Sequence, residues 1–199
     1  MLYRIKITQL KTTLSILLLF TLLTGCKVAQ KVATKNLEYY PLNKGNTWTY
    51  QYNDSPSTLT VKIIDKDVKI NGKKYYKIQR TYSWNKPSID YSRNENGGHF
   101  SYDDKSKGES VVIPKNIKVG YTWKQCDKSW EYEILAINTP LKTPTTNYTG
   151  LLKIRATQLT NRDQLKKSEY HLYFKKGVGK VAAKGNGQLM TYLIKSKIK

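Results

Sequence analysis

The sequence predicts an all-β protein, an antiparallel half-open barrel or a β-sandwich of roughly ten to twelve strands that follows an N-terminal signal segment. Three observations support this fold class. From Glu38 onward, apolar and polar residues alternate with a period of two, which is typical of strands with one buried and one solvated face. Glycine-containing turn signals separate these segments, and no window of the same region carries a sustained helical stripe.

The alternating segments give the expected strands in order. They cover 47–52, 58–63, 76–79, 130–134, 152–155 and 170–175. Turn signals lie at 71–72, 96–98, 107–108, 177–179 and 185–187. A single flat sheet with this many strands would leave one apolar face in water, so we expect the sheet to close on itself or to pack against a second sheet.

A short pattern occurs twice along the chain. Residues 45–48 read Gly-Asn-Thr-Trp and residues 120–123 read Gly-Tyr-Thr-Trp, and a glycine-centred hairpin with an apolar strand follows each copy. The distance from Trp48 to Ile78 is 30 positions, and that from Trp123 to Ile154 is 31. Chance agreement in a chain rich in Thr, Lys and Gly is the alternative to a duplication. If the pattern is a duplication, the two halves are similar β-meanders that together close one core.

Composition and charge narrow the functional classes. The 199 residues include 35 Lys and Arg against 14 Asp and Glu, which gives a formal net charge of +21. Thirty of the basic residues are Lys and five are Arg. Base readout depends on Arg, so we expect no nucleic-acid partner; weak affinity for an anionic lipid is the more modest expectation. The two Cys lie 100 positions apart, which suits neither a disulfide framework nor a metal site.

The first 25 residues contain the parts of an export signal in the right order. Three basic residues precede an apolar run over 14–23, which is shorter than the ~20 residues that span a bilayer. The run ends in Leu23-Thr24-Gly25-Cys26, which resembles the bacterial lipobox. We therefore predict a lipoprotein signal peptide over 1–25, a lipidated N-terminus and tether over 26–37, and a single β-domain over 38–199.

The lipobox resemblance implies that Cys26 carries a thioether-linked diacylglycerol, usually with a further acyl chain on its amine that palmitate labelling would reveal. Two or more acyl chains give stable anchoring, so the mature protein would stay on a membrane. Lys27 stands where an Asp would signal inner-membrane retention, which favours the outer membrane of a cell envelope that has one. A plain secretory signal with a free Cys26 is the alternative.

Two further segments resemble those of uncharacterised envelope lipoproteins. Residues 41–50 fit the pattern P-L-x-x-G-x-x-W-x-Y, and residues 173–181 fit an aromatic segment followed by Gly-Val-Gly. Some of these proteins are similar in architecture to the lipoprotein carriers LolA and LolB, which have a half-open antiparallel barrel around an apolar cavity. The resemblance implies a fold and no chemistry, and no functional residue is carried over from it.

Candidate catalytic or metal-binding residues are few. His99 and His171 lie 72 positions apart, and no Cys, Asp or Glu stands beside either at ligand spacing. Asp103 and Asp104 could hold calcium or act as an acid and a base, but a solvated hairpin tip is the commoner structure for such a run. A two-histidine metal site therefore stays a minor alternative to structural histidines.

The other candidate motifs also have simpler interpretations. Residues 177–180, Gly-Val-Gly-Lys, lack the full phosphate-loop pattern and precede a strand, so we interpret them as a turn. Glu131 and Glu133 could be paired carboxylates, but any half-exposed strand shows this alternation. Cys126 is expected to be a buried or half-buried thiol. The sequence thus predicts no catalytic residue, no cofactor and no metal.

The leading functional hypothesis is a non-catalytic envelope lipoprotein that binds or carries an apolar or amphipathic ligand. It depends on an aromatic stripe, which consists of Trp48, Tyr50, Trp130, Tyr132 and Tyr170. The same residues could instead simply fill the core. The second hypothesis is an interaction subunit of an envelope protein assembly, and the third is a hydrolase.

Overall fold

The computed structural model describes residues 38–160 and 168–199, so the predicted signal peptide, the tether and Cys26 lie outside the described residues. Within the described ranges the chain forms twelve strands and no helix. The strands are β1 (Thr47–Tyr52), β2 (Thr58–Ile70), β3 (Lys73–Tyr82), β4 (Asn85–Glu95), β5 (Gly98–Asp103), β6 (Gly108–Ile113), β7 (Thr122–Lys124), β8 (Trp130–Lys142), β9 (Asn147–Gln158), β10 (Glu169–Lys175), β11 (Gly179–Gly185) and β12 (Gln188–Lys197). Each segment predicted from the alternation lies within one of them.

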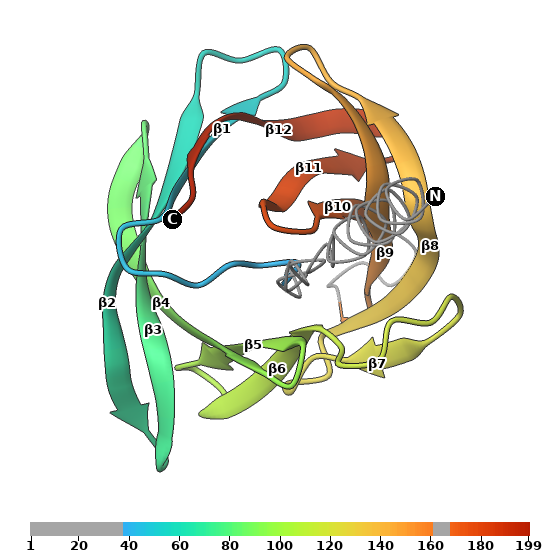
Figure 1. Ribbon diagram of the computed structural model, residues 1–199. Helices are drawn as coiled ribbons and strands as arrows, with labels where there is room; N and C mark the ends of the chain where they lie inside the picture. Colours follow the sequence, from blue (N-terminus) through green and yellow to red (C-terminus); the bar gives the residue numbers. More distant parts are fainter. Residues whose placement is uncertain (1–37, 161–167) are drawn as a thin grey trace, which may run out of the picture. The chain divides into compact units, whose positions relative to one another are not determined.

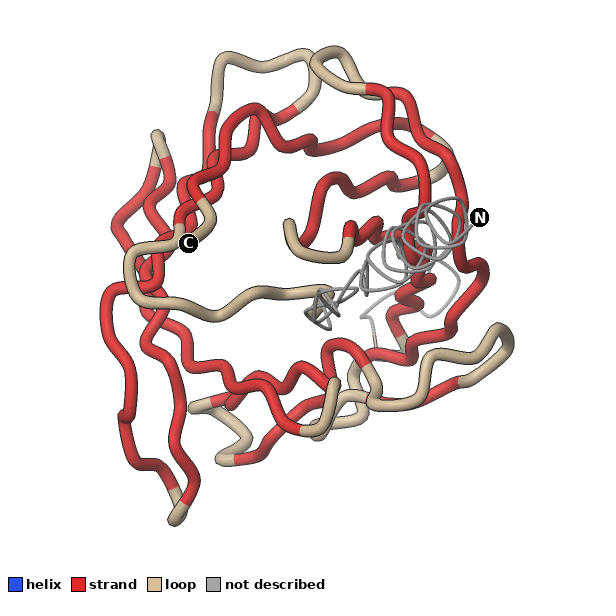
Figure 2. Tube along the Cα trace, in the orientation of Figure 1, coloured by secondary structure: helices blue, strands red, loops and turns tan. Residues whose placement is uncertain are grey.

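One sheet contains all twelve strands, in the order β6-β5-β4-β3-β2-β1-β12-β11-β10-β9-β8-β7. Figures 1 and 2 show this sheet curling round until its two ends, β6 and β7, approach each other. Two hydrogen bonds connect these ends: Trp123 Nε1 donates to the Val111 carbonyl oxygen at 2.8 Å, and Cys126 N donates to Ser110 Oγ at 3.0 Å. The all-β prediction is confirmed, and of its two forms the chain adopts a nearly closed antiparallel barrel.

The two six-stranded halves, β1–β6 and β7–β12, begin with the same backbone hydrogen bonds. In the first half Gly45 N donates to the Ile63 carbonyl oxygen at 2.8 Å, and in the second Gly120 N donates to that of Ile134 at 2.9 Å. Each isoleucine N–H returns a bond of 3.0 Å to the residue after the glycine. These glycines are the first residues of the Gly-x-Thr-Trp pattern that occurs twice in the sequence.

The correspondence between the halves continues along their long strands. The two isoleucines pair across the sheet with Ile78 on β3 and Ile154 on β9. Beyond them both β2 and β8 lose register with their neighbours, and each irregular stretch contains one residue with a positive φ, Asp67 at 61° and Asn138 at 66°. Positions in the two halves can therefore be compared one by one.

Residues 38–46, which we call the strap, cross one end of the barrel in front of the sheet in Figure 1. The Glu38 carbonyl oxygen accepts a hydrogen bond from Gly177 N at 2.8 Å, and that of Tyr40 accepts one from Asn94 Nδ2 at 2.8 Å. These bonds attach the strap to the β10–β11 turn and to β4. The strap is therefore held across this end of the barrel at two points.

Trp48 is the centre of the core behind the strap. Its side chain is completely buried, lies 5.1 Å from the Tyr40 ring, and donates from Nε1 to the Val178 carbonyl oxygen at 2.5 Å. A Cβ at Gly179 would lie 3.1 Å from that same nitrogen, and Gly179 has a φ of 110°. The Gly-Val-Gly turn thus allows the backbone to approach the indole closely.

An ion pair on the outer face connects β4 to β6. Arg93 donates two hydrogen bonds to the Glu109 carboxylate, at 2.6 and 2.7 Å, and Tyr75 donates its hydroxyl proton at 2.5 Å. The two charged side chains are only 10% and 18% exposed. Burial alone would raise the pKa of Glu109, but hydrogen bonds from Arg93, Tyr75 and Lys73 outweigh it and lower the pKa to about 2.

Within residues 38–160 and 168–199, no helix is long and apolar enough to cross a membrane.

Candidate functional site

The barrel interior contains a chamber of about 160 Å³ behind the strap. Its lining contains both apolar and polar side chains. The apolar lining consists of Val61, Ile78, Val112, Leu172 and Phe174. The polar lining consists of Tyr40, Tyr50, Arg80, Ser92, His99, Ser101 and Lys180. A mixed wall of this kind is typical of sites for small molecules that have one polar end.

Two cations face the chamber, and they differ in their partners. The Arg80 guanidinium on β3 donates from Nε to the Asp90 carboxylate on β4, and both side chains are 33% exposed although they point inward. The ammonium of Lys180 on β11 lies over the Tyr50 ring, 5.1 Å from its centre. Among the residues that the structure describes, none supplies a carboxylate within 4 Å of that ammonium. Burial, together with the charge of Arg80, lowers the pKa of Lys180 to about 8.

A neutral histidine, His99, is among the side chains that line the chamber. The His99 ring stacks on Tyr40 of the strap, with ring centres 4.5 Å apart, and its Nδ1 lies 2.8 Å from Asn94 Oδ1. Burial and the charge of Arg80 lower the pKa of His99 to about 3. The histidine therefore stays uncharged at neutral pH and leaves Arg80 and Lys180 as the cations of the chamber.

The second half of the barrel shows that the fold itself does not need charge at the positions of Arg80 and Asp90. Ile78 and Ile154 correspond to each other. The positions two residues further along their strands, and the partners of these strands on β4 and β10, therefore correspond as well. The resulting matches are Arg80 with Ala156, Asp90 with Leu172, and Ser92 with Phe174. Three apolar residues of one half are thus replaced by three polar residues in the other. A barrel that packs with apolar residues at one set of positions has no evident structural need for charge at the matching set.

Two groups of aromatic side chains lie near the strand ends that are remote from the strap. Trp84, in the β3–β4 turn, packs edge-on against Tyr52 and Tyr82, with ring centres 4.8 and 5.3 Å apart. Trp130 and Tyr170 form a further pair at 5.7 Å. Trp84 is 52% exposed. Of the predicted aromatic stripe, Trp48 and Tyr50 fill the core, Tyr132 stacks on Trp123 at 5.4 Å beside the core, and Trp130 and Tyr170 belong to these strand ends.

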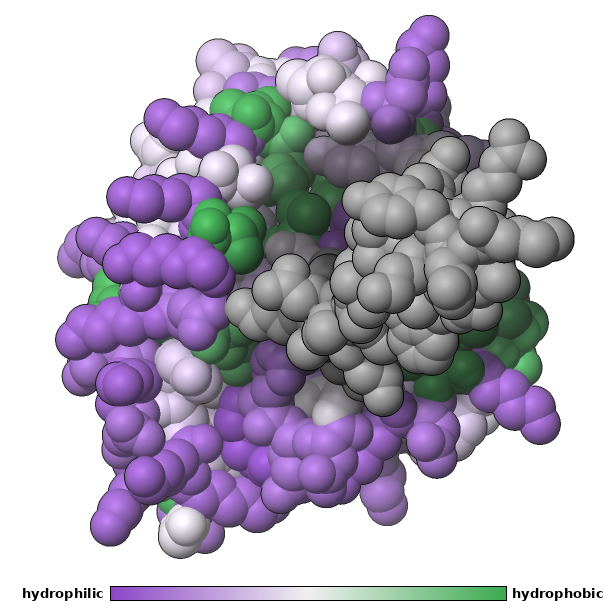
Figure 3. Space-filling view, viewed as in Figure 1, coloured by the Kyte–Doolittle hydropathy of each residue, from purple (hydrophilic) through white to green (hydrophobic). Residues whose placement is uncertain are grey.

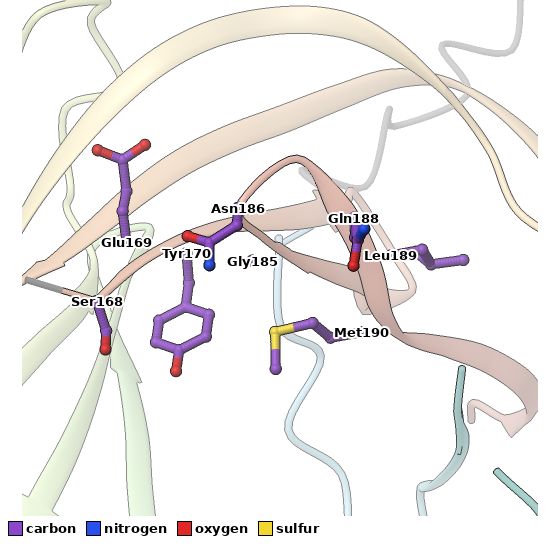
Figure 4. Close-up of a pocket in the computed structure, with 8 residues that line it drawn as sticks. All are labelled: Ser168, Glu169, Tyr170, Gly185, Asn186, Gln188, Leu189 and Met190. Atoms are coloured by element: carbon purple, nitrogen blue, oxygen red, sulfur yellow. The ribbon is translucent and has the colours of Figure 1, made fainter. Parts of the chain in front are cut away.

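A second, larger hollow of about 540 Å³ lies beside the β11–β12 turn (Figure 4). In Figure 4 the side chains of Tyr170 and Met190 extend to one side of the hairpin and that of Glu169 to the other. The Glu169 carboxylate lies 3.2 Å from His171 Nε2. Because the polar groups of this hollow do not converge on one point, we place the candidate site in the chamber.

The hydrophilic surface is distributed around the barrel. Figure 3 shows hydrophilic side chains over much of the visible rim, with hydrophobic ones exposed between them.

The structure separates the two histidines named from the sequence. His99 lies inside the barrel, whereas His171 is on the opposite face of β10 from Leu172 and pairs with Glu169. Among the described residues, no group of three or more His, Cys, Asp or Glu side chains could hold a metal ion.

The paired acids Asp103 and Asp104 have partners within their own turn. Asp103 accepts hydrogen bonds from Lys105 N and Ser106 Oγ at 2.9 and 2.7 Å, which stabilises the β5–β6 turn. Asp104 pairs with Lys107 at 3.3 Å. These contacts match the interpretation of the run as a hairpin tip.

The remaining candidates take part in strand-to-strand contacts. Glu133 pairs with Arg155 across β8 and β9, and Glu131 lies 3.9 Å from Lys124. Cys126 is a free, half-buried thiol whose sulfur is 3.1 Å from Ser106 Oγ. Cys26 lies outside the described residues.

Neither cation of the chamber was among the candidate residues predicted from the sequence. Arg80 could have been found, because it continues the inward series of β3, two positions after Ile78 and two before Tyr82. Lys180 offers no such signal. The register of β10 and β11 shifts between Tyr173 and Phe174, so the alternation does not predict which way this lysine points.

Comparison with known proteins gives a fold and no family. No protein-family model matches the chain, and no curated protein matches its sequence. Two crystal structures are similar: a candidate exported protein with a YmcC-like fold from Bacteroides fragilis, with a TM-score of 0.52, and a candidate lipoprotein from Parabacteroides distasonis, with a TM-score of 0.51. Each is 11% identical over 81% of this chain and 99% of the other. At this identity the similarity shows that the chain shares their fold, which by itself does not determine function.

Proposed function

We propose that the protein is a lipoprotein of the cell envelope, anchored to a membrane through acylated Cys26, whose barrel binds a small amphipathic ligand in the chamber without catalysing a reaction. The observation that carries the ligand-binding role is the pair of inward cations beside an apolar wall. The position that matches Arg80 in the second half holds Ala156, so a role in packing does not account for the charge of Arg80.

Two observations support the envelope location. The N-terminal sequence has a basic segment, a ten-residue apolar run and a lipobox-like Leu-Thr-Gly-Cys in the order that lipoprotein export requires. Two proteins that share the fold are described as exported and as a lipoprotein. Lys27 favours transport onward to an outer membrane.

The volume of the chamber limits the size of the ligand. Pockets for drug-sized molecules start at roughly 300 Å³, and the chamber has about 160 Å³. We therefore propose a small ligand held at one end by the cations, and not the transport of a complete lipid.

The Cys26→Ala variant tests the anchor. We expect metabolic labelling with palmitate to mark the wild-type protein and not the variant, and we expect the variant to leave the membrane fraction, because the thioether cannot form. Cys126→Ala is the matched control and should keep both the label and the membrane location. Label retained on the Cys26 variant would refute the lipoprotein assignment.

A filled chamber tests the ligand-binding role. Isothermal titration calorimetry with 1-hexanol and hexanoate measures whether the purified β-domain binds a small amphipath. We expect Ser101→Leu to weaken binding by roughly tenfold or more, because the leucine occupies space next to the apolar wall. Ser196→Leu, at an exposed position of β12 that does not line the chamber, is the control and should bind as the wild type does. Absence of binding of both probes to the wild type would contradict the proposed function.

A further inference from the structure

We propose that Lys180 and Arg80 form an anion subsite and that the ligand of the chamber is a monocarboxylate with a short apolar chain. This inference rests on the proposed ligand-binding function and adds the chemical class of the ligand.

The first support is the environment of Lys180. Its ammonium has the face of the Tyr50 ring at 5.1 Å, while the nearby Asp90 carboxylate already accepts a hydrogen bond from Arg80. No other carboxylate among the described residues forms a salt bridge with Lys180. Lys180 is half-buried, and an ammonium that is partly removed from water without a counter-ion destabilises a fold unless something else neutralises it. An anion that enters the chamber would complete this arrangement.

The second support is the number of charges. Arg80 and Lys180 contribute two positive charges and Asp90 one negative charge, so the chamber has a formal charge of +1. A carboxylate balances this charge with its single negative charge, whereas a phosphate monoester carries about 1.5 to 2 negative charges at neutral pH. The charge count thus favours a monocarboxylate over a phosphate.

The third support is the composition and the volume of the chamber. Val61, Ile78 and Phe174 line the chamber together with the two cations, so a ligand held there by its carboxylate also has apolar side chains within reach of its chain. A volume of 160 Å³ corresponds to about five water molecules at ~30 Å³ each. A chain of a few carbon atoms suits this space.

The groups around Lys180 determine how binding should depend on pH. Arg80 and Asp90 form an ion pair, His99 has a pKa of about 3, and burial raises the pKa of Tyr40 and Tyr50. Lys180, with its pKa of about 8, therefore changes its charge in the weakly alkaline range. Above pH 8 the free protein loses the ammonium, so the affinity for a carboxylate should fall while that for an alcohol of the same length should not.

The experiment compares hexanoate with 1-hexanol by isothermal titration calorimetry at pH 7 and pH 9. We expect wild type at pH 7 to bind hexanoate roughly tenfold or more tightly than 1-hexanol, because a charge-assisted hydrogen bond is added. Lys180→Met should abolish this preference and leave the affinity for 1-hexanol unchanged. Lys184→Met is the matched control, because Lys184 on the same strand pairs with outward-facing His171. It should retain the preference.

Thermal unfolding provides a second measurement. If Lys180 stabilised the fold, its replacement would lower the Tm instead of raising it. Lys180→Met removes an uncompensated charge near Arg80, so we expect the Tm to rise by about 2–4 °C. Lys180→Gln, which keeps a polar group, should lose the preference as well. Equal affinities of wild type for the two probes, or a preference that survives in both Lys180 variants, would overturn the anion subsite while leaving the ligand-binding function in place. Failure of both probes to bind would overturn both.

Discussion

Replacing Trp48 with alanine is expected to lower the free energy of unfolding by about 3–5 kcal/mol, the range typical of removing a buried tryptophan. The indole is completely buried, contacts Tyr40 of the strap and donates a hydrogen bond to the Val178 carbonyl oxygen. Its loss would leave a cavity, remove the ring contact with Tyr40 of the strap and remove the hydrogen bond to the β10–β11 turn. Urea denaturation followed by tyrosine fluorescence or circular dichroism measures the change.

The matched control for this prediction is Trp84→Ala. Trp84 is 52% exposed and packs edge-on against Tyr52 and Tyr82, so its removal should cost about 1 kcal/mol or less. Equal losses of stability in the two variants would show that Trp48 is not the centre of the core.

The Glu109→Gln variant is expected to lose about 3 kcal/mol of stability at pH 7, because breaking a buried ion pair leaves the remaining charge without a partner. The variant would remove the negative charge that Arg93 and Tyr75 contact on the outer face of β3, β4 and β6. Glu131→Gln is the control. Its carboxylate is 43% exposed and lies 3.9 Å from Lys124, so we expect a change within about 0.5 kcal/mol.

The Glu109 carboxylate also makes the stability of the wild-type protein sensitive to acid. The pKa of Glu109 is about 2 in the folded protein, and that of an unfolded glutamate is ~4.3. The ion pair therefore stabilises the fold fully above about pH 4.3, and this contribution is lost as the pH falls toward 2. In denaturation curves recorded between pH 6 and pH 2, Glu109→Gln should lose less stability than wild type. Parallel pH profiles for the two proteins would contradict this account.

The strands could be predicted because their signal is local. In residues 47–52 the alternation of Trp48, Tyr50 and Tyr52 with polar neighbours reflects the pleat of the backbone, which places successive side chains on opposite faces. The same reasoning extends to Arg80, which occupies an inward position of β3. It fails for Lys180, because the register shift between β10 and β11 breaks the alternation that precedes it.

The sequence by itself determined that the domain is antiparallel and all-β, and it predicted the lipidated N-terminus from motifs that are read along the chain. Only the tertiary structure decided that the sheet closes into a barrel and that Arg80 and Lys180, 100 positions apart, line one chamber. The physical reason is that alternation is a property of neighbouring residues, whereas the closure of the chamber depends on long-range pairing such as that of β1 with β12. This pairing connects the two halves, so that apolar and charged side chains from both of them line the same chamber.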